Sequence, residues 1–412
     1  MQSENAAVQA DRSSRGAVRV YYLDWLRVLA ILTVFVFHCG RFFDLEDWLV
    51  KNPRTYFGVE VWTYFLAGWL MPLIFLISGA SIFYALGKGS GIHAVGKFVK
   101  DRTLRLVVPW LVGACTHVAL QVYFESRFWG RSYGSFFAFF PHYFDGFKEF
   151  GGNFSWTGMH LWYLWVLFIL SVAFLPLFLW LKAGSGMRVL SWLGGFLAKP
   201  GAVYLLAIPG TLLIGYMDPD RFLNSQDWGG WPLLLYIPYF LAGFLIVSHE
   251  GLQVRVRRQR WLSLAAGVVM FLALLVVALT QGDPVFDTPV YSVFFALFSL
   301  FSWCFVLAIL GFGMQHLTAN TPFLRYANEA VLPFYILHQT VIISVVFYVV
   351  RWPIPDLLKF AIIATSSFAI IMLLYEFLIR RLNLLRFLFG MKLRPKAPAV
   401  QPGEAVGTVP SA

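Results

Sequence analysis

Long apolar runs alternate with short polar segments along the chain, from residue 20 to about residue 380. A helix needs about 20 apolar residues to cross a hydrocarbon core about 30 Å thick. The pattern therefore predicts an all-α fold, a polytopic transmembrane helix bundle of about ten spans. The predicted spans lie near residues 20–39, 62–86, 104–124, 160–181, 202–217, 231–248, 261–280, 290–312, 330–350 and 357–379.

Composition supports a membrane protein rather than a set of soluble domains. Hydrophobic residues make up 59% of the 412 residues, charged residues make up 13%, and the mean hydropathy is +0.69. Soluble domains carry about 25% charged residues. We expect one transmembrane domain over residues 20–392, between a tail at 1–19 and a disordered tail at 393–412. The three cysteines are scattered, so neither a disulfide framework nor a metal site is expected.

The net charge of +11 is mainly a topology signal. When alternate loops are assigned to one side, most of the 32 lysines and arginines fall there, and the opposite loops carry aspartates such as Asp44 and Asp218. By the positive-inside rule the basic side is cytoplasmic, and both tails lie on it. Nucleic acid is not an expected partner, because the basic residues are divided among loops that border lipid.

The first apolar run carries three polar groups on one helical face. At about 100° per residue, the 11 residues from Arg27 to His38 come within about 20° of three full turns, and Asp24 points roughly the same way. Arg27 lies toward the cytoplasm, about 16 Å along the helix axis from His38. One interpretation is a local Asp24–Arg27 ion pair with an interfacial histidine. The other is a polar stripe facing the bundle interior, with His38 as a general base.

Two other segments also allow a plain and a functional interpretation. Arg102 and Arg105 precede the third span and suit bidentate phosphate binding, or they are ordinary positive-inside residues. The outer loop at 125–158 is unusually aromatic. It is either an aromatic belt at the membrane interface or a stacking platform for a sugar acceptor.

Four motifs together resemble a known family. The stretches "LDWLRVLAILTVFVFH", "LIFLISGAS", "DRTLRLVVP" and "AVLPFYILHQTV" resemble the acyltransferase 3 family of bacterial integral-membrane O-acyltransferases. Within that family, "GMHLWYLWVLF" and "YIPYFLAGFLI" look most like the subgroup that modifies periplasmic glucans. The resemblance covers residues 20 to 392.

The resemblance implies a multi-pass protein of the bacterial cytoplasmic (inner) membrane. Such a protein transfers an acyl group, acetyl or succinyl, from cytoplasmic acyl-CoA to a hydroxyl of a glycan or related acceptor on the outer side. Acyl-CoA is then the donor co-substrate, with no permanently bound cofactor, and the expected partners are the lipid bilayer, acyl-CoA and the acceptor. His38 would be the catalytic base, Arg27 would line the CoA path, and Arg102 with Arg105 would clamp the CoA phosphates. Asp24 is counted with His38 and Arg27 in the catalytic group, where it either orients Arg27 or neutralises its charge. Glu376 would lie near the CoA entrance.

Several expectations stay open at this stage. The candidate acceptor-binding residues are His160, Trp162, His338, Gln339 and Ser78. His160 is a second acid/base or an interfacial residue, and His338 is a buried neutral histidine or part of a polar lining. Ser78 is a candidate oxyanion donor beside Gly79, which we expect to be a close helix-packing site.

Two further alternatives concern charge pairing and function. Glu329 is expected to pair with Arg325, and Glu376 with Arg380 four residues on. The alternative function is a non-enzymatic exporter or carrier of a glycan or lipid, in which the intramembrane charges line a translocation path.

Overall fold

A computed structural model describes residues 20–87, 92–131, 133–214, 217–218, 228–282 and 284–394. Within these residues the fold is helical, without a strand and with one isolated bridge between Phe147 and Phe154. The predicted all-α bundle is therefore confirmed. The predicted tail at 1–19, the tail at 393–412 beyond residue 394, and residues 215–216 of one predicted span lie outside the described residues.

Among the described residues, seven helices are long and apolar enough to cross a membrane. They are α2 (Tyr21–Gly40), α3 (Phe57–Ala85), the composite helix His93–Phe128, α13 (Glu250–Gln281), α14 (Pro289–His316), α15 (Pro322–Val349) and the composite helix Asp356–Ile379. Two bent helix pairs raise the number to nine if each pair is one span. The first joins Met159–Ala173 to α9 (Leu175–Leu181) at 49°, and the second joins α10 (Gly184–Leu197) to Ala202–Ile214 at 115°. With the shorter α12 (Tyr236–Ser248), these segments cover the ten predicted ones, and ten spans stays a prediction.

The composite and bent helices are built from shorter elements. The first composite consists of α4 (Ile92–Arg102), the π-helical turn η1 (Thr103–Val107), α5 (Val108–Cys115) and α6 (Val118–Phe128). The second consists of α16 (Asp356–Leu374) and the π-helical turn η6 (Tyr375–Ile379). The other elements are α7 (Phe136–His142), η2 (Lys148–Phe150), η3 (Met159–Leu161), α8 (Trp162–Ala173), η4 (Ala202–Ala207), α11 (Ile208–Ile214), η5 (Leu233–Leu235) and α17 (Asn383–Leu388).

The composite helix His93–Phe128 differs most from its predicted span at 104–124. It begins earlier, because the polar α4 continues into the apolar part without a stop. It is also interrupted at Thr116, where the backbone leaves helical geometry before α6 starts. Gly113, just before this break, leaves room for two side chains, since a Cβ there would lie 2.3 Å from Leu161 Cδ1 and 2.9 Å from His117 Nε2.

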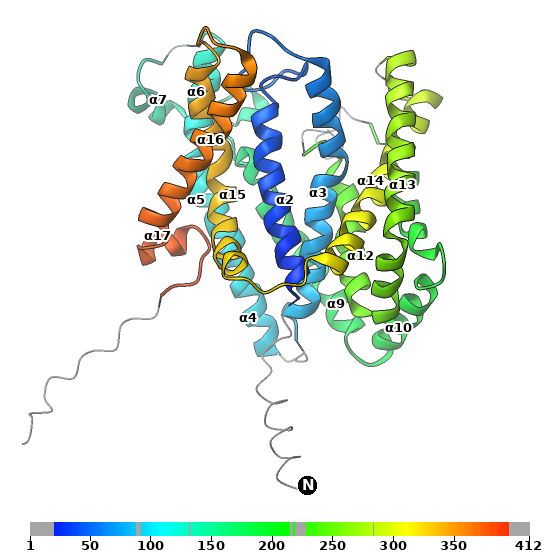
Figure 1. The fold of residues 1–412 in the computed structure, drawn as a ribbon. Coiled ribbons are helices and arrows are strands. Elements are labelled where there is room, and N and C mark those ends of the chain that lie inside the picture. Colours follow the sequence, from blue (N-terminus) through cyan, green and yellow to red (C-terminus); the bar gives the residue numbers. More distant parts are fainter. Residues whose placement is uncertain are drawn as a thin grey trace, which may run out of the picture.

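Helix α2 lies in the middle of the bundle and packs against α3, α14, α15 and α16 (Figure 1). We call the end where α2 begins the arginine end, because it holds Arg27, Arg102 and Arg105. The opposite end, where α2 ends, is the loop end, formed largely by residues 41–56 and 129–158.

The tightest helix crossing pairs α3 with α12. A Cβ on Gly79 would lie 1.8 Å from the carbonyl oxygen of Phe240, and one on Gly243 would lie 1.9 Å from that of Leu76. Only glycine lets the two backbones approach so closely. The expected close-packing role of Gly79 is confirmed.

Candidate active site

A cavity of about 840 Å³ lies at the loop end of the bundle. Its wall combines the end of α2, the loop that follows α2, α3, the segment before α8, and α15. Four predicted site residues line it, namely His38, His160, Trp162 and Gln339. Gln339 is buried, and its side chain has no hydrogen-bond partner among the described residues. The fold therefore gathers residues from distant parts of the chain around one space.

His38 is held in this cavity by aromatic rings. Its ring stacks on Trp48, with ring centres 5.3 Å apart and planes 9° apart, and makes a T-shaped contact with Phe37, with ring centres 5.2 Å apart. Nδ1 of His38 is buried and has no hydrogen-bond partner among the described residues. The side chain as a whole is partly exposed and lines the cavity. His38 is thus fixed in orientation while keeping one edge toward the open space.

The ring of His338 lies next to that of His38, with centres 5.1 Å apart. Its Nδ1–H donates to the carbonyl oxygen of Tyr335 at 2.5 Å. A carbonyl only accepts, so Nδ1 holds the proton and Nε2 keeps a lone pair. Nε2 of His338 is buried and has no partner among the residues that the structure describes. Two neighbouring rings therefore each present an unsatisfied buried nitrogen.

His160 uses both ring nitrogens within the protein. Nε2–H donates to the carbonyl oxygen of Ile336 at 3.0 Å, which leaves Nδ1 to accept from Gln121 Nε2 at 3.3 Å. The hydroxyl of Tyr335 also donates to the backbone carbonyl of His160. The residue is buried at the cavity wall rather than set in an interface. His160 therefore has no free nitrogen for proton transfer in this arrangement.

The sequence did not predict a buried polar cluster next to His160, which consists of His117, Gln121 and Thr340. Thr340 Oγ1 accepts from Gln121 Nε2 at 2.7 Å and lies 2.9 Å from His117 Nδ1. The rings of His117 and His160 are 6.5 Å apart. The available signal was a histidine and a glutamine four residues apart inside a predicted apolar span, where polar groups usually face the bundle interior.

Below the cavity, two tyrosines form a hydroxyl-bearing layer. Tyr163 lies 5.8 Å from Tyr335, ring centre to ring centre, and its hydroxyl lies 2.7 Å from Ser78 Oγ. Ser78 donates its own proton to the carbonyl oxygen of Ile74 at 2.7 Å. This geometry commits the Ser78 proton to the helix backbone, so the expected oxyanion role gains no support.

Arg27 ties three helices together at the arginine end. It donates to Ser81 Oγ of α3 at 2.7 Å, to Asn328 Oδ1 of α15 at 3.4 Å, and to Asp24 Oδ1 at 3.2 Å. The local ion pair that the spacing predicts is present. Arg27 nevertheless faces other helices rather than lipid, as the stripe interpretation requires.

Arg102 and Arg105 flank the start of the π-helical turn η1 at the same end. Arg102 lies over the ring of Phe98 at 5.2 Å. Neither arginine forms a hydrogen bond or an ion pair with the described residues. Both are repelled by Arg27, and Asp24 attracts Arg105. Three guanidinium groups thus lie near one another with only the carboxylates of Asp24 and Asp101, among the described residues, acting on them, an arrangement suited to an anionic ligand.

Glu376 lies in the second π-helical turn, η6, beside a separate charge network. Arg380 donates to both of its oxygens at 2.9 Å, as expected, and Tyr326 donates to Oε2 at 3.2 Å. The expected Glu329–Arg325 pair is wrong. Glu329 pairs with Arg386 at 3.0 Å instead, because α17 folds back under the bundle. Among the described residues no histidine, cysteine and carboxylate groups are arranged to hold a metal ion.

The helical fold thus brings His38 to a cavity at one end of the bundle and gathers three arginines at the opposite end. Residues 20–376 match the acyltransferase domain family, and the chain belongs to that family. Among its relatives are the glucans biosynthesis protein C of Salmonella heidelberg and that of Salmonella agona. Each is 23% identical over 401 residues, covering 92% of this chain and 97% of the relative. No solved structure matches.

Proposed function

We propose that this membrane acyltransferase moves an acetyl or succinyl group from acyl-CoA to a hydroxyl of a glycan. The donor binds at the arginine end, in the cytoplasm, and the acceptor enters at the loop end, outside the bacterial cytoplasmic membrane. The clustering of basic residues on the arginine side supports this orientation. The relatives are named for the biosynthesis of glucans, which supports a glycan acceptor.

One observation carries the proposal. Helix α2 presents His38 to a cavity of about 840 Å³ at one end and Arg27 to the arginine cluster at the other. The two residues are about 16 Å apart along the helix axis. The extended arm of CoA would cross this distance with its phosphates held by the arginines. The thioester would then reach the acceptor beside His38.

The chemistry needs one general base. Nε2 of His38 removes the proton from the acceptor hydroxyl as the oxygen attacks the thioester carbonyl. A carbon–oxygen bond forms, the carbon–sulfur bond breaks, and the imidazolium returns the proton to the departing thiolate. Gln339, whose amide faces the cavity without a protein partner among the described residues, is positioned to bind the acceptor or the developing oxyanion.

His338 acts as a positioning residue in this scheme. The two nitrogens are not hydrogen-bonded in the structure, and the scheme requires the buried Nδ1–H of His38 to donate to the Nε2 lone pair of the neighbouring His338 ring. A proton held on Nδ1 leaves the lone pair of His38 on Nε2, the nitrogen that must act as base. A carboxylate commonly has this role in catalytic pairs, and here a neutral imidazole replaces it.

The direct test uses proteoliposomes, labelled acyl-CoA and gluco-oligosaccharide acceptors. We expect His38→Ala to lower kcat by roughly two to four orders of magnitude, as for the loss of a general base. His142→Ala is the matched control, because His142 is an exposed histidine at the loop end that bonds only to Asp145 Oδ2 through its side chain. Wild-type activity of His38→Ala at equal protein level would refute His38 as the base.

A further inference from the structure

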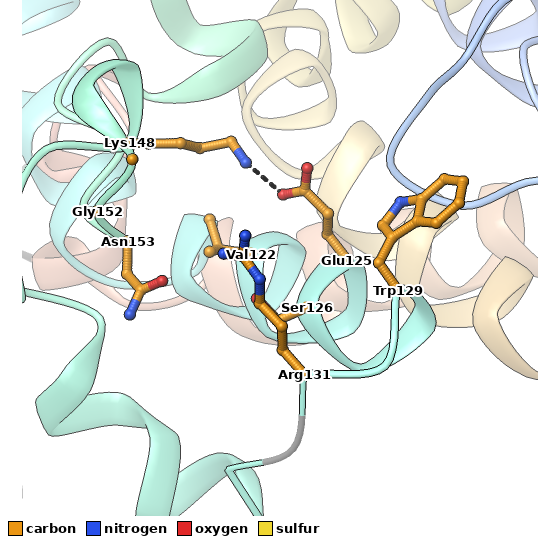
Figure 2. A pocket seen from close by; sticks show the side chains of 9 residues that line it. Val122, Glu125, Ser126, Trp129, Arg131, Lys148, Gly152 and Asn153 are labelled. Carbon is orange, nitrogen blue, oxygen red and sulfur yellow. Dashed lines mark hydrogen bonds and ion pairs between the residues drawn. The ribbon is translucent and has the colours of Figure 1, made fainter.

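A second, smaller cavity lies beside the catalytic one at the loop end. Its volume is about 270 Å³, and it lies between the last turns of α6 and the loop that carries η2. Figure 2 shows Lys148 reaching Glu125 across it, with Trp129 and Asn153 on opposite sides. This space is near the lower limit of small-ligand sites, roughly 300 Å³, and matches a single sugar ring better than an oligomer.

The lining combines the two features that carbohydrate recognition uses. Trp129 is 56% exposed and offers aromatic surface for the apolar side of a pyranose ring, with Phe128 packed T-shaped against it. Around it stand side chains that bond hydroxyl groups: Glu125, Lys148, Arg131 and Asn153. Lys148 and Glu125 are 2.5 Å apart and only partly exposed, so both are held in place. The charged pair supplies a donor and an acceptor for neighbouring hydroxyls.

Two of these polar groups keep bonding capacity for a ligand. Asn153 is buried and donates through Nδ2 to the carbonyl oxygen of His142 at 2.9 Å, while its own carbonyl oxygen has no partner among the described residues. The exposed guanidinium of Arg131 likewise forms no hydrogen bond or ion pair within the described part of the chain. Both side chains belong to the wall of the small cavity.

Lys148 joins the two cavities, since it lines both. The residues that follow Lys148 line one cavity or the other. Gly151 to Asn153 face the small cavity, whereas Glu149, Ser155 and Thr157 face the large one. The loop is anchored beneath by Tyr143, whose hydroxyl donates to the carbonyl oxygen of Ala114 at 2.7 Å. Burial raises the pKa of Tyr143, so the hydroxyl keeps this proton. The partition is therefore a fixed part of the fold.

We propose that the small cavity is an acceptor subsite that binds a sugar residue remote from the one being acylated. The acceptor is then an oligomeric glycan that passes over Lys148 from one cavity to the other, not a free monosaccharide. This inference rests on the proposed function and adds the length of the acceptor to it. Trp129 stacks on the remote sugar, and Arg131 with Asn153 bonds its hydroxyls.

The test compares acceptors of increasing length, from methyl β-glucoside to linear β-linked gluco-oligosaccharides, in proteoliposomes with labelled acyl-CoA. We expect the wild-type KM to fall as the acceptor becomes long enough to fill both cavities. Trp129→Ala and Arg131→Ala should each raise KM for the long acceptors about tenfold and leave kcat and the KM for the monomer unchanged. Trp352→Ala and Arg54→Ala are the controls, because both residues are exposed at the loop end and line neither cavity.

The outcomes separate this subsite from the function on which it rests. Equal KM values for monomer and oligomers in the wild type, or unchanged oligomer KM in both variants, would overturn the subsite while leaving glycan acylation intact. Wild-type protein that acylates none of the glucose acceptors would overturn both proposals for this acceptor class. Using two variants on different parts of the wall guards against a folding defect in one of them.

Discussion

His38 and His338 lie side by side in the bundle, with ring centres 5.1 Å apart, and each keeps one buried nitrogen without a partner among the described residues. The backbone carbonyl of Tyr335 fixes the proton of His338 on Nδ1. In the proposed scheme His338 Nε2 accepts from His38 Nδ1–H, as a carboxylate does in many catalytic pairs, although the two nitrogens are not hydrogen-bonded in the structure. This role makes His338 the most informative residue to change after His38 itself.

Substitutions of His338 test whether it orients the catalytic His38 without contributing to substrate binding. His338→Leu removes the nitrogen that accepts from His38 Nδ1–H in the proposed scheme, so we expect kcat to fall roughly ten- to a hundredfold with little change in either KM. His338→Gln supplies a carbonyl oxygen and should recover part of the loss. The measurement is the pair kcat and KM for donor and acceptor, together with the pH profile of kcat. A parallel loss in both variants, with lowered thermal stability, would indicate a packing role only.

The arginine cluster predicts a salt-sensitive donor site. Arg102→Ala and Arg105→Ala should each raise the KM for acyl-CoA about tenfold or more, because each removes a cation that lacks an ion-pair partner among the described residues. The wild-type KM should also rise with ionic strength, since Arg105 is exposed and Arg102 is partly exposed. Arg325→Ala is the control, an exposed arginine at the same end of the bundle. Saturable CoA binding that survives loss of both arginines would contradict this donor site.

The close crossing of α3 and α12 predicts that a larger side chain at position 79 strongly destabilises the protein. Gly79→Val places new atoms against the carbonyl of Phe240, where no flexible side chain can yield, and we expect a loss of more than about 3 kcal/mol of stability. The readout is the apparent melting temperature of the detergent-solubilised protein. Gly58→Ala, in the first turn of the same helix with open space around it, should be neutral or slightly stabilising. An unchanged melting temperature in Gly79→Val would show that the helices are not so close.

Asp44 holds the loop that presents Trp48 to His38. Its carboxylate is fully buried and pairs with Arg41 and Lys51, each at 2.7 Å. Asp44→Asn should cost about 3–5 kcal/mol, because it leaves two cations with one fewer partner, and kcat should fall as Trp48 loses its position. Asp145→Asn breaks an exposed pair at the same end and should cost less than about 1 kcal/mol. Full activity and stability in Asp44→Asn would argue against this coupling.

Periodicity was sufficient to predict what lies on a single helix. The angular positions of Asp24, Arg27 and His38 follow from 100° per residue, and all three face the bundle. The same rule predicts the Glu376–Arg380 pair. These features depend on local geometry alone, so the sequence carries them completely.

Contacts between distant segments were beyond this reasoning. Nothing in the spacing of His338 relates it to His38, and the pairing of Glu329 with Arg386 depends on α17 folding back under the bundle. The π-helical turns beside Arg105 and Glu376 also leave no simple mark in the sequence. Each results from packing across the bundle, which a reading along one chain segment cannot evaluate.

The layer formed by Tyr163 and Tyr335 bears on whether the protein lets ions cross the membrane. Both rings are buried and their hydroxyls are bonded, and they lie between the cavity at the loop end and the arginine cluster. Under the proposed function a polar glycan enters from one face and a charged nucleotide from the other, and without this layer the protein would leak protons and potassium. The CoA arm would then pass between the two rings, which limit the opening to the width of that arm and restrict the loss of ion gradients.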